Sequence, residues 1–322
     1  MNGSKYDAWE QYEDYAYEDN SREARRHRRG RDHSPTARRR RRHEAKRMAQ
    51  MSDRVASFVP TYVQNLDPQH HERQWVIDSV APFYSNSQIS DVLRLVKGGK
   101  EANVYLCQAH PRTGHDLLAA KLYRPRMLRH LKNNALYKEG RFLRDEQGKL
   151  LLGSREARAM ASKTRFGQQL DLAAWIVHEY EIQSQLYEAG ADVPRPVAYG
   201  GNTILMEYLG GAVLPAPLLD EITLAPEAAQ PLFERLLYNV ELMLAHHLVH
   251  ADLSAYNILY WEGELTIIDF PQVVDARTNP NAFSLLQRDM QRVYDYFAGY
   301  GVQADARGLA HTLWERYMRA EL

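Results

Sequence analysis

The chain has 322 residues, 44% of them hydrophobic, and equal numbers of acidic and basic side chains give a formal net charge of zero. This length and composition suit one two-lobed domain of about 230 residues with a tail, or two small domains. Because no run of about 18 apolar residues and no signal-peptide core is visible, and the single Cys107 excludes an internal disulfide, we expect a cytoplasmic protein without a membrane partner.

The zero net charge hides an uneven distribution over the first 48 residues. Residues 1–20 carry six acids against Lys5, a net charge of −5, whereas residues 22–47 carry twelve arginines and Lys46 against three acids, a net charge of +10. Such a segment cannot bury enough apolar surface to offset its ordering entropy, so residues 1–48 are predicted to form a disordered tail. The basic stretch 22–47 suits contact with RNA or a ribosomal subunit through phosphates, although a solubilising tail fits the same composition.

The first half of the remaining chain is predicted to be mostly β. Residues 49–90 favour one or two short helices that end near Ser85. Strand-like patterns follow at 92–96, 103–107 and 117–123, with a tight glycine turn at 97–100. Residues 138–165 are rich in charge, Gly and Ser and predict a flexible loop. A helix is expected over 170–189, ended by Gly190, and after an extended segment at 193–196 a short strand over 203–206.

The second half is predicted to be mostly helical. The clearest helix covers residues 227–247, a hairpin is expected at 258–260 and 265–268, and the chain from about residue 281 reads as helical. The sequence therefore predicts an α+β fold with two lobes and a cleft between them. The β-rich lobe would span 91–206 and the helical lobe 207–322, with a hinge near 207–211.

The strongest chemical signal is the segment His250-Ala251-Asp252-Leu253-Ser254-Ala255-Tyr256-Asn257, followed twelve residues later by Asp269. Phosphoryl transfer from ATP needs a carboxylate to orient the attacking hydroxyl and oxygen ligands to hold Mg²⁺ on the phosphates. An Asp and an Asn five residues apart on one loop, with a second Asp brought back by a hairpin, can supply these groups.

Lys121 lies in an otherwise apolar strand and would need an anionic partner if it were half-buried. The helix at 170–189 offers one, because Glu179 falls in an apolar stripe with Trp175 and Ile182. A carboxylate in such a stripe is costly unless it is paired, so we predict a Lys121–Glu179 ion pair. The alternative is that Glu179 reaches solvent at the helix edge.

The glycine turn contains Gly98, Gly99 and Lys100 and lacks the full G-x-G-x-x-G pattern. Alone it is a weak phosphate-binding signal, since paired glycines occur in many hairpins. Its position one strand before Lys121 makes it a stronger candidate.

Together these residues resemble the RIO family of atypical protein kinases. The resemblance rests on Gly99-Lys100-Glu101-Ala102-Asn103-Val104-Tyr105, on Ala120-Lys121-Leu122-Tyr123-Arg124, on Glu179-Tyr180, on Met206-Glu207-Tyr208, and on residues 248–259 and 267–272. It covers roughly residues 85–300, and residues 49–90 would then be a family-specific helical segment.

The resemblance implies an ATP-dependent kinase with a truncated helical lobe. Asp252 would be the base, Asn257 and Asp269 would bind Mg²⁺ (or Mn²⁺), and Asp269 can carry phosphate in an ATPase cycle. Lys121, supported by Glu179, would contact the ATP phosphates with the turn at Gly98, Gly99 and Lys100, and the segment with Met206, Glu207 and Leu209 would hold the adenine. The family implies autophosphorylation, for which Ser154, Ser162 and Thr164 are candidates, and a role in maturation of the small ribosomal subunit.

Two departures from ordinary kinases limit these expectations. Pro271 stands where a glycine commonly follows the Asp-Phe pair, and no Ala-Pro-Glu motif follows Asp269, which puts transfer to separate peptides in doubt. Two other functions stay open. One is a small-molecule phosphotransferase, which shares the His-x-Asp loop, and the other is an RNA-associated scaffold that uses ATP as a switch.

Overall fold

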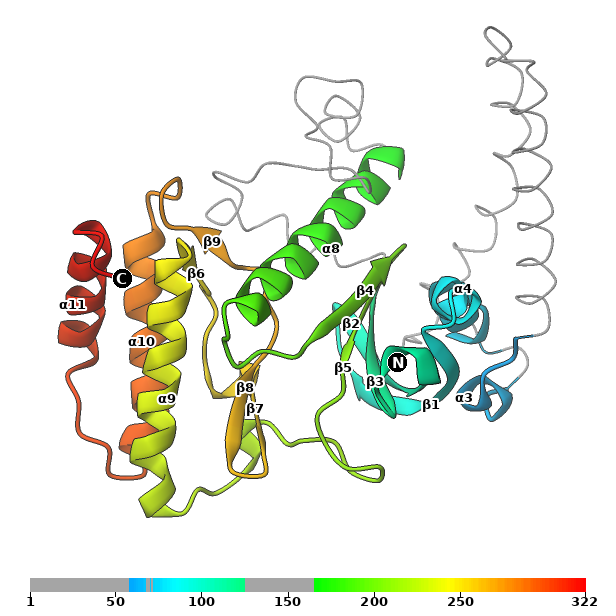
Figure 1. Ribbon diagram of the computed structural model, residues 1–322, viewed down its shortest axis with the longest axis horizontal. Coiled ribbons are helices and arrows are strands. Elements are labelled where there is room, and N and C mark those ends of the chain that lie inside the picture. The colour runs from blue at the N-terminus through cyan, green and yellow to red at the C-terminus, as the bar shows by residue number, and fades with distance from the viewer. Residues whose placement is uncertain (1–57, 68–69, 71, 125–164) are drawn as a thin grey trace, which may run out of the picture.

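The computed structural model describes residues 58–67, 70, 72–124 and 165–322. The predicted tail, the loop at 138–164 and the three candidate phosphorylation sites lie outside the described residues. Where the prediction can be compared, the fold is the expected α+β arrangement, with a sheet in the first half and helices in the second (Figure 1).

One five-stranded antiparallel sheet forms the first lobe, with the strand order β1-β2-β3-β5-β4. Within the described residues two helices precede it, α3 (Thr61–Gln64) and α4 (Glu72–Ser85). The strands are β1 (Ile89–Gly98), β2 (Ala102–Ala109), β3 (Leu117–Tyr123), β4 (Pro196–Gly200) and β5 (Thr203–Glu207), with a short 3₁₀ turn η2 (Pro111–Thr113) before β3.

The central strand β3 is apolar on both faces, and a different helix packs against each face of the sheet. On one face Leu118, Ala120 and Leu122 pack in a cluster with residues of α4. On the other face Tyr123 packs with residues of α8 (Arg165–Glu188). Side chains alternate between the two faces along a strand, so Lys121 shares the α8 face with Tyr123.

The second lobe is built on three helices that pack together in Figure 1. They are α9 (Pro226–Ala245), α10 (Ala282–Ala298) and α11 (Ala306–Met318). The smaller elements are η4 (Leu219–Glu221), β6 (Leu248–Val249), η5 (Ala255–Asn257), β7 (Ile258–Trp261), β8 (Glu264–Ile267) and β9 (Val274–Asp275). β7 and β8 form the expected hairpin, and β6 pairs with β9.

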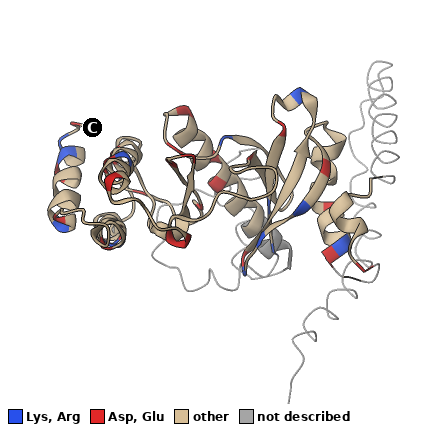
Figure 2. Cartoon of the chain, turned by 90° about the horizontal axis from the view of Figure 1, so that it is seen from below, with Lys and Arg blue, Asp and Glu red and all other residues tan. Residues whose placement is uncertain are grey.

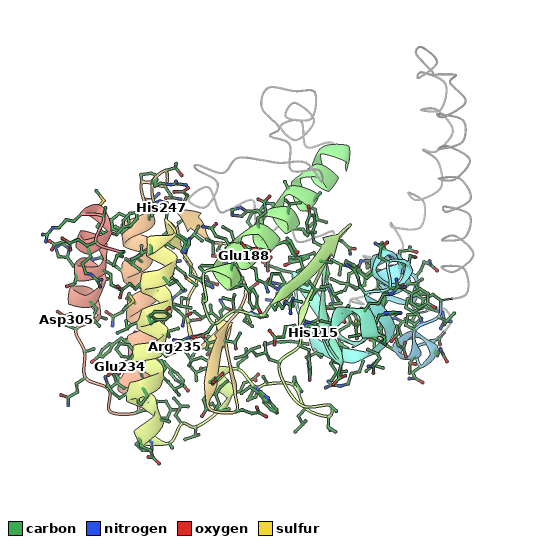
Figure 3. All side chains as sticks on the ribbon, in the orientation of Figure 1. His115, Glu188, Glu234, Arg235, His247 and Asp305 are labelled. Carbon is green, nitrogen blue, oxygen red and sulfur yellow. The ribbon has the colours of Figure 1, made fainter. Side chains whose placement is uncertain are left out.

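A polar contact joins the end of α8 to α9. The guanidinium of Arg235, labelled in Figure 3, donates from Nε and Nη2 to the two carboxylate oxygens of Asp192 at 2.6 and 2.8 Å. Asn239 donates to the same carboxylate at 2.7 Å and accepts from the Asp192 N–H at 2.8 Å. The turn that leaves α8 is therefore fixed on the helical lobe.

Some boundaries differ from the predicted ones. α8 begins at Arg165, five residues before the expected start and at the last residue of the predicted loop. Residues 196–200, of which only the first was expected to be extended, form the edge strand β4. Pro196 is tolerated there because an edge position does not require every N–H.

None of the helices in the described ranges is long and apolar enough to cross a membrane. In Figure 2 acidic and basic positions are interspersed along the described part of the chain. The strong charge segregation seen in residues 1–47 is thus a property of that segment of the sequence.

Candidate active site

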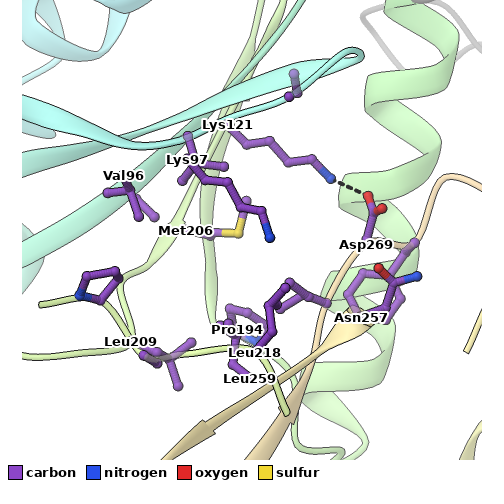
Figure 4. Close-up of a pocket in the computed structure, with 18 of the residues that line it drawn as sticks. Val96, Lys97, Lys121, Pro194, Met206, Leu209, Leu218, Asn257, Leu259 and Asp269 are labelled. Atoms are coloured by element: carbon purple, nitrogen blue, oxygen red, sulfur yellow. Dashed lines mark hydrogen bonds and ion pairs between the residues drawn. The ribbon is translucent and has the colours of Figure 1, made fainter. Parts of the chain in front are cut away.

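A cavity of about 550 Å³ lies between the sheet and the helical lobe (Figure 4). Its walls combine side chains of both lobes, and many of them are apolar: Val96, Val104, Ala119, Met206, Leu218, Leu259 and Ile268. An apolar slot with a few polar groups at one end is the usual form of a small-molecule site and suits a flat base with charged groups beyond it.

Lys121 is the central polar residue of this cavity. Its Nζ lies 2.7 Å from Oε1 of Glu179 and 2.7 Å from Oδ1 of Asp269, and Figure 4 marks the second contact. The Lys121 side chain is 14% exposed and that of Glu179 only 3%, whereas that of Asp269 is 42% exposed. The structure thus contains the ion pair expected from the sequence and adds a second carboxylate to it.

The pKa values of Lys121, Glu179 and Asp269 are set by burial and by the charges of their neighbours. Burial alone would lower the pKa of Lys121, but Asp269 and Glu179 raise it well above its usual value, so the lysine stays charged. Burial raises the pKa of Glu179, which Lys121 offsets only in part. Burial would also raise the pKa of Asp269, yet Lys121 lowers it below the usual range. Asp269 is therefore the carboxylate of this pair that is held in its ionised form.

Asp252 and Asn257 lie on the loop between β6 and β7. The Nδ2 of Asn257 donates to the Asp252 carbonyl at 2.9 Å and to its Oδ2 at 3.3 Å. Gln272 donates to the same Oδ2 at 3.4 Å, and Arg292 of α10 contacts Oδ1 at 2.8 Å. These contacts fix the orientation of the Asp252 carboxylate from three sides.

The same bonds orient the Asn257 amide. Because Nδ2 faces Asp252, Oδ1 of Asn257 is the atom left to accept a donor or bind a cation. The β7–β8 hairpin brings Ile268 N–H to the Asn257 carbonyl at 2.9 Å, which places Asp269 next to this amide. Both residues line the cavity.

An Asn and an ionised Asp at the mouth of a cavity fit a magnesium ion. In the described part of the chain no group of three or more His, Cys, Asp or Glu side chains could hold a metal. Mg²⁺ does not require one, since it commonly uses one or two carboxylates or amides and fills its other positions with water and substrate phosphates.

The backbone around the loop is held in unusual conformations. Ala251 has φ 65° and Asp269 has φ 74°, both in the left-handed region, which costs about 1–3 kcal/mol each and clusters at functional sites. The N–H of Ala251 donates to Oδ2 of the buried Asp289 at 2.6 Å, and Arg288 donates to the Ala251 carbonyl. Helix α10 thus holds the strained residue from both sides.

His250 braces the loop from the inside. Its Nδ1 accepts from the Asp252 N–H at 3.3 Å, its Nε2 lies 3.4 Å from the Ile268 carbonyl, and its ring packs on Phe270 at 5.5 Å. Burial lowers the pKa of His250, so the ring stays neutral at physiological pH.

The other predicted binding residues mostly reach the cavity. Gly99, Lys100, Met206, Glu207 and Leu209 line it. The carbonyl of Leu209 accepts from Ala216 N–H at 3.0 Å, while the Leu209 N–H is not used by any other group that the structure describes, so it is free to meet a ligand acceptor.

Two predicted residues stand outside the lining. Gly98 ends β1 with Asn103 and Leu95 as its near neighbours. Asp252 lies just beyond the cavity, on the far side of Asn257. The carboxylate of Asp252 therefore lies beside the cavity, next to Asn257.

Sequence reasoning missed four residues that act on Asp252 or its loop: Gln272, Arg288, Asp289 and Arg292. Asp289 and Arg292 lie on α10, about 40 residues from the loop, and no local motif marks them. A buried Asp in the apolar stripe of a helix, here between Leu286 and Val293, was the available signal for Asp289.

The chain is similar in sequence to known proteins. A family model described as the RIO domain matches residues 152–309. The chain is 32% identical over 208 residues to a serine/threonine-protein kinase RIO1 of Caenorhabditis elegans, covering 64% of this chain and 37% of that protein. It is 31% identical over 144 residues to a RIO-type serine/threonine-protein kinase Rio1 of Thermoplasma acidophilum, covering 45% of this chain and 74% of that protein.

A third relative is a serine/threonine-protein kinase RIO1 of Homo sapiens, 29% identical over 216 residues, with 66% of this chain and 34% of that protein covered. The chain therefore spans little more than a third of the two eukaryotic relatives and about three quarters of the archaeal one.

Proposed function

The chain belongs to the RIO kinase family, and we propose that it is an ATP- and magnesium-dependent serine/threonine kinase that works with the residues of the cleft. The observation that carries the proposal is Lys121, which joins Glu179 and Asp269 at 2.7 Å each inside the cavity, beside the Asp252–Asn257 loop. Fold and family support an enzyme of this class, and the residue roles below are part of the proposal.

In this proposal the nucleotide lies with its base in the apolar slot. The segment at Met206, Glu207 and Leu209 holds the adenine, and Lys121 holds the phosphates, with Glu179 keeping the lysine in place. The turn at Gly98, Gly99 and Lys100 covers the phosphates with backbone N–H groups. Asn257 and Asp269 hold a magnesium ion, which would neutralise phosphate charge when bound. The predicted lobe boundary between residues 206 and 207 falls one residue before the end of β5 (Thr203–Glu207), so Glu207 belongs to the sheet.

The transfer step needs one base. Asp252 accepts the hydrogen bond of a serine or threonine hydroxyl and takes its proton as the hydroxyl oxygen bonds to the γ-phosphorus. The bond from that phosphorus to the bridging oxygen breaks, and ADP leaves with the electron pair. Arg292 and Asn257 keep the Asp252 carboxylate aimed at the acceptor.

The test is incubation of the pure protein with γ-labelled ATP and Mg²⁺, comparing wild type with Asp252→Ala and Asp269→Ala. Acid-stable label on the wild type alone supports a serine or threonine autokinase with this base and metal ligand. Free phosphate without acid-stable label would favour an ATPase cycle through Asp269, and ATP binding without turnover would favour an ATP-switched scaffold. Mn²⁺ is run in parallel as an alternative ion.

Autophosphorylation and small-molecule transfer need separate assays. The candidate sites Ser154, Ser162 and Thr164 are tested by mass spectrometry of the labelled protein, since they lie outside the described residues. Label that passes to an aminoglycoside or sugar, and never to protein, would favour a small-molecule phosphotransferase. Membership of the RIO family speaks against that outcome.

We extend the proposal to a role in the maturation of the small ribosomal subunit, on the charge of residues 22–47 and on the family. RNA binding that weakens steeply with salt, and is lost on deletion of residues 1–48 while ATP turnover stays, supports it. Binding that survives the deletion would contradict it. Cell fractionation tests the expected cytoplasmic location.

A further inference from the structure

A chain of hydrogen bonds centred on the buried Asn103 connects helix α4 to the glycine turn, and we infer that Asn103, held by Glu72, is a positioning residue for the phosphate-binding turn. The inference rests on the proposed nucleotide site and adds to it a role for the helical segment before the sheet. It assigns a function to Asn103, a residue of the turn motif that the proposed mechanism does not use.

Asn103 is the centre of this chain of bonds. It is 2% exposed, at the start of β2. Its Nδ2 donates to Glu72 Oε1 at 3.3 Å and to the Tyr105 hydroxyl at 3.0 Å. Its Oδ1 accepts from the Arg124 guanidinium at 2.8 Å and from the Gly99 N–H at 3.4 Å. The amide uses both donors and its acceptor, so its orientation is set.

The acceptor side of Asn103 holds the turn. Gly99 lines the nucleotide cavity and its N–H is bound to Asn103 Oδ1. The other end of the turn is fixed by the Arg124 N–H, which donates to the Glu101 carbonyl at 2.8 Å. Gly99 also has no room for a side chain, because a Cβ there would lie 2.7 Å from the Ala102 carbonyl oxygen. The turn is therefore tied at two points, and Asn103 supplies one of them.

Helix α4 determines the direction in which the Nδ2 group of Asn103 faces. Glu72 opens that helix, and its Oε1 accepts from Asn103, from the Tyr105 hydroxyl and from the Tyr62 hydroxyl at 3.4 Å. An amide can rotate by half a turn and exchange its oxygen for its nitrogen. The Glu72 carboxylate accepts hydrogen bonds only, so it forces Nδ2 toward itself and leaves Oδ1 facing Gly99 and Arg124.

Removal of Glu72 distinguishes a positioning role from a simple electrostatic effect, because the two predict opposite changes in the affinity for ATP. Glu72 does not line the cavity. Glu72→Ala deletes a negative charge, so charge alone would strengthen the binding of ATP phosphates. If Glu72 positions the turn through Asn103, the same variant weakens ATP binding by about tenfold and leaves adenosine binding unchanged, because only the phosphates meet the turn.

Exchanging donor and acceptor gives a rescue test. Glu72→Gln keeps an acceptor oxygen for Asn103 and should bind ATP like the wild type. Asn103→Asp places two carboxylates against each other and should bind ATP poorly. In the double variant Glu72→Gln with Asn103→Asp, the introduced amide can donate to the introduced carboxylate, and ATP affinity returns toward that of the wild type.

The measurement is titration of the full chain with Mg-ATP and, separately, with adenosine, well below the melting temperature of each variant. Asp78→Ala is the matched control, since it removes an acid from the same helix whose contact is with Gln74 at 2.7 Å. The inference is overturned if Glu72→Ala leaves the ratio of ATP to adenosine affinity unchanged or raises it. It is also overturned if the double variant shows no recovery. A wild type that binds adenosine but not Mg-ATP would instead overturn the proposed function together with the inference.

Discussion

At the scale of single residues, the cleft is organised by one cation between two acids of different burial. Glu179 is buried and Asp269 is half exposed. Lys121 therefore pairs with one acid in the protein interior and with a second acid at the cavity. Lys121 compensates the buried charge of Glu179 together with the Tyr123 hydroxyl, which donates to the other carboxylate oxygen. Under the proposed mechanism, activity and stability therefore depend on the same lysine side chain.

Lys121→Met should lower phosphoryl transfer by about a hundredfold and lower the free energy of unfolding by about 3 kcal/mol, because it leaves a buried carboxylate without its charge partner. Adding Glu179→Gln should restore most of the stability and none of the activity. Urea denaturation and the labelled-ATP assay measure the two effects. Equal stability of the single and double variants would contradict this account of Glu179.

A second residue makes stability depend on pH. Burial raises the pKa of Asp289 from 3.8 to about 7, although Arg288 and the Ala251 N–H act against the rise. The folded protein therefore binds this proton more tightly than the unfolded chain. The stability that this contributes is complete below about pH 4 and is lost as the pH rises through 7.

Asp289→Asn removes that titration and keeps an oxygen for the Ala251 N–H. Relative to wild type, the variant should gain unfolding free energy between pH 4 and pH 8, by at most about 4 kcal/mol. Urea denaturation at several pH values measures the difference. Parallel curves for the two proteins would show that Asp289 does not titrate in this range.

At the scale of elements, α10 acts as a brace for the loop that carries Asp252. Arg288 and Asp289 hold the two backbone groups of Ala251, and Arg292, one turn later, holds the Asp252 carboxylate. Successive turns of one helix face present residues four apart on the same side, which explains how Arg288 and Arg292 reach one loop. These three residues of α10 position Asp252, and none of them lines the cavity.

Arg292→Gln should therefore lower kcat about tenfold and leave the KM for ATP unchanged. The substitution removes a contact that orients the Asp252 carboxylate toward the acceptor hydroxyl and leaves the ATP-binding residues in place. Arg319→Gln, just after α11, is the matched control, since Arg319 contacts Glu315 at 3.5 Å and neither residue belongs to the Asp252 loop. Steady-state kinetics provides both constants. An unchanged kcat, or a change confined to the KM for ATP, would contradict the positioning of Asp252 by Arg292.

The elements that sequence predicted well are those with local signals. The stripe of Trp175, Glu179 and Ile182 indicated both α8 and the burial of its acid, and the apolar run around Lys121 gave β3 with its observed bounds. The two-residue strands β6 and β9 were missed, since they exist only through pairing with each other across the loop. The same reason hid Arg292, whose partner lies 40 residues away.

At the scale of the whole molecule, the cavity is made by both lobes and neither completes it alone. The sheet supplies Lys121 and the glycine turn, while the helical lobe supplies Asn257 and Asp269. In the structure the contact of Lys121 with Asp269 is a direct ion pair between the lobes. A ligand that engages both sides therefore stabilises the folded arrangement as a whole.

Mg-ATP at a hundred times its dissociation constant should stabilise the folded state by about 2.7 kcal/mol, which corresponds to a rise in melting temperature of roughly 5–10 °C for a domain of this size. Asp269→Asn removes the proposed anionic magnesium ligand and leaves Lys121 paired with Glu179 alone, so ATP alone should still stabilise the variant while the additional increment from Mg²⁺ disappears. Thermal unfolding with ATP, with and without Mg²⁺, measures both parts.

Asp275→Asn is the control, because Asp275 pairs with Arg277 at 2.5 Å and does not line the cavity. Equal magnesium increments in the two variants would place the ion somewhere other than Asp269, whereas loss in Asp269→Asn alone would tie the binding of Mg²⁺ to the residue that joins the lobes.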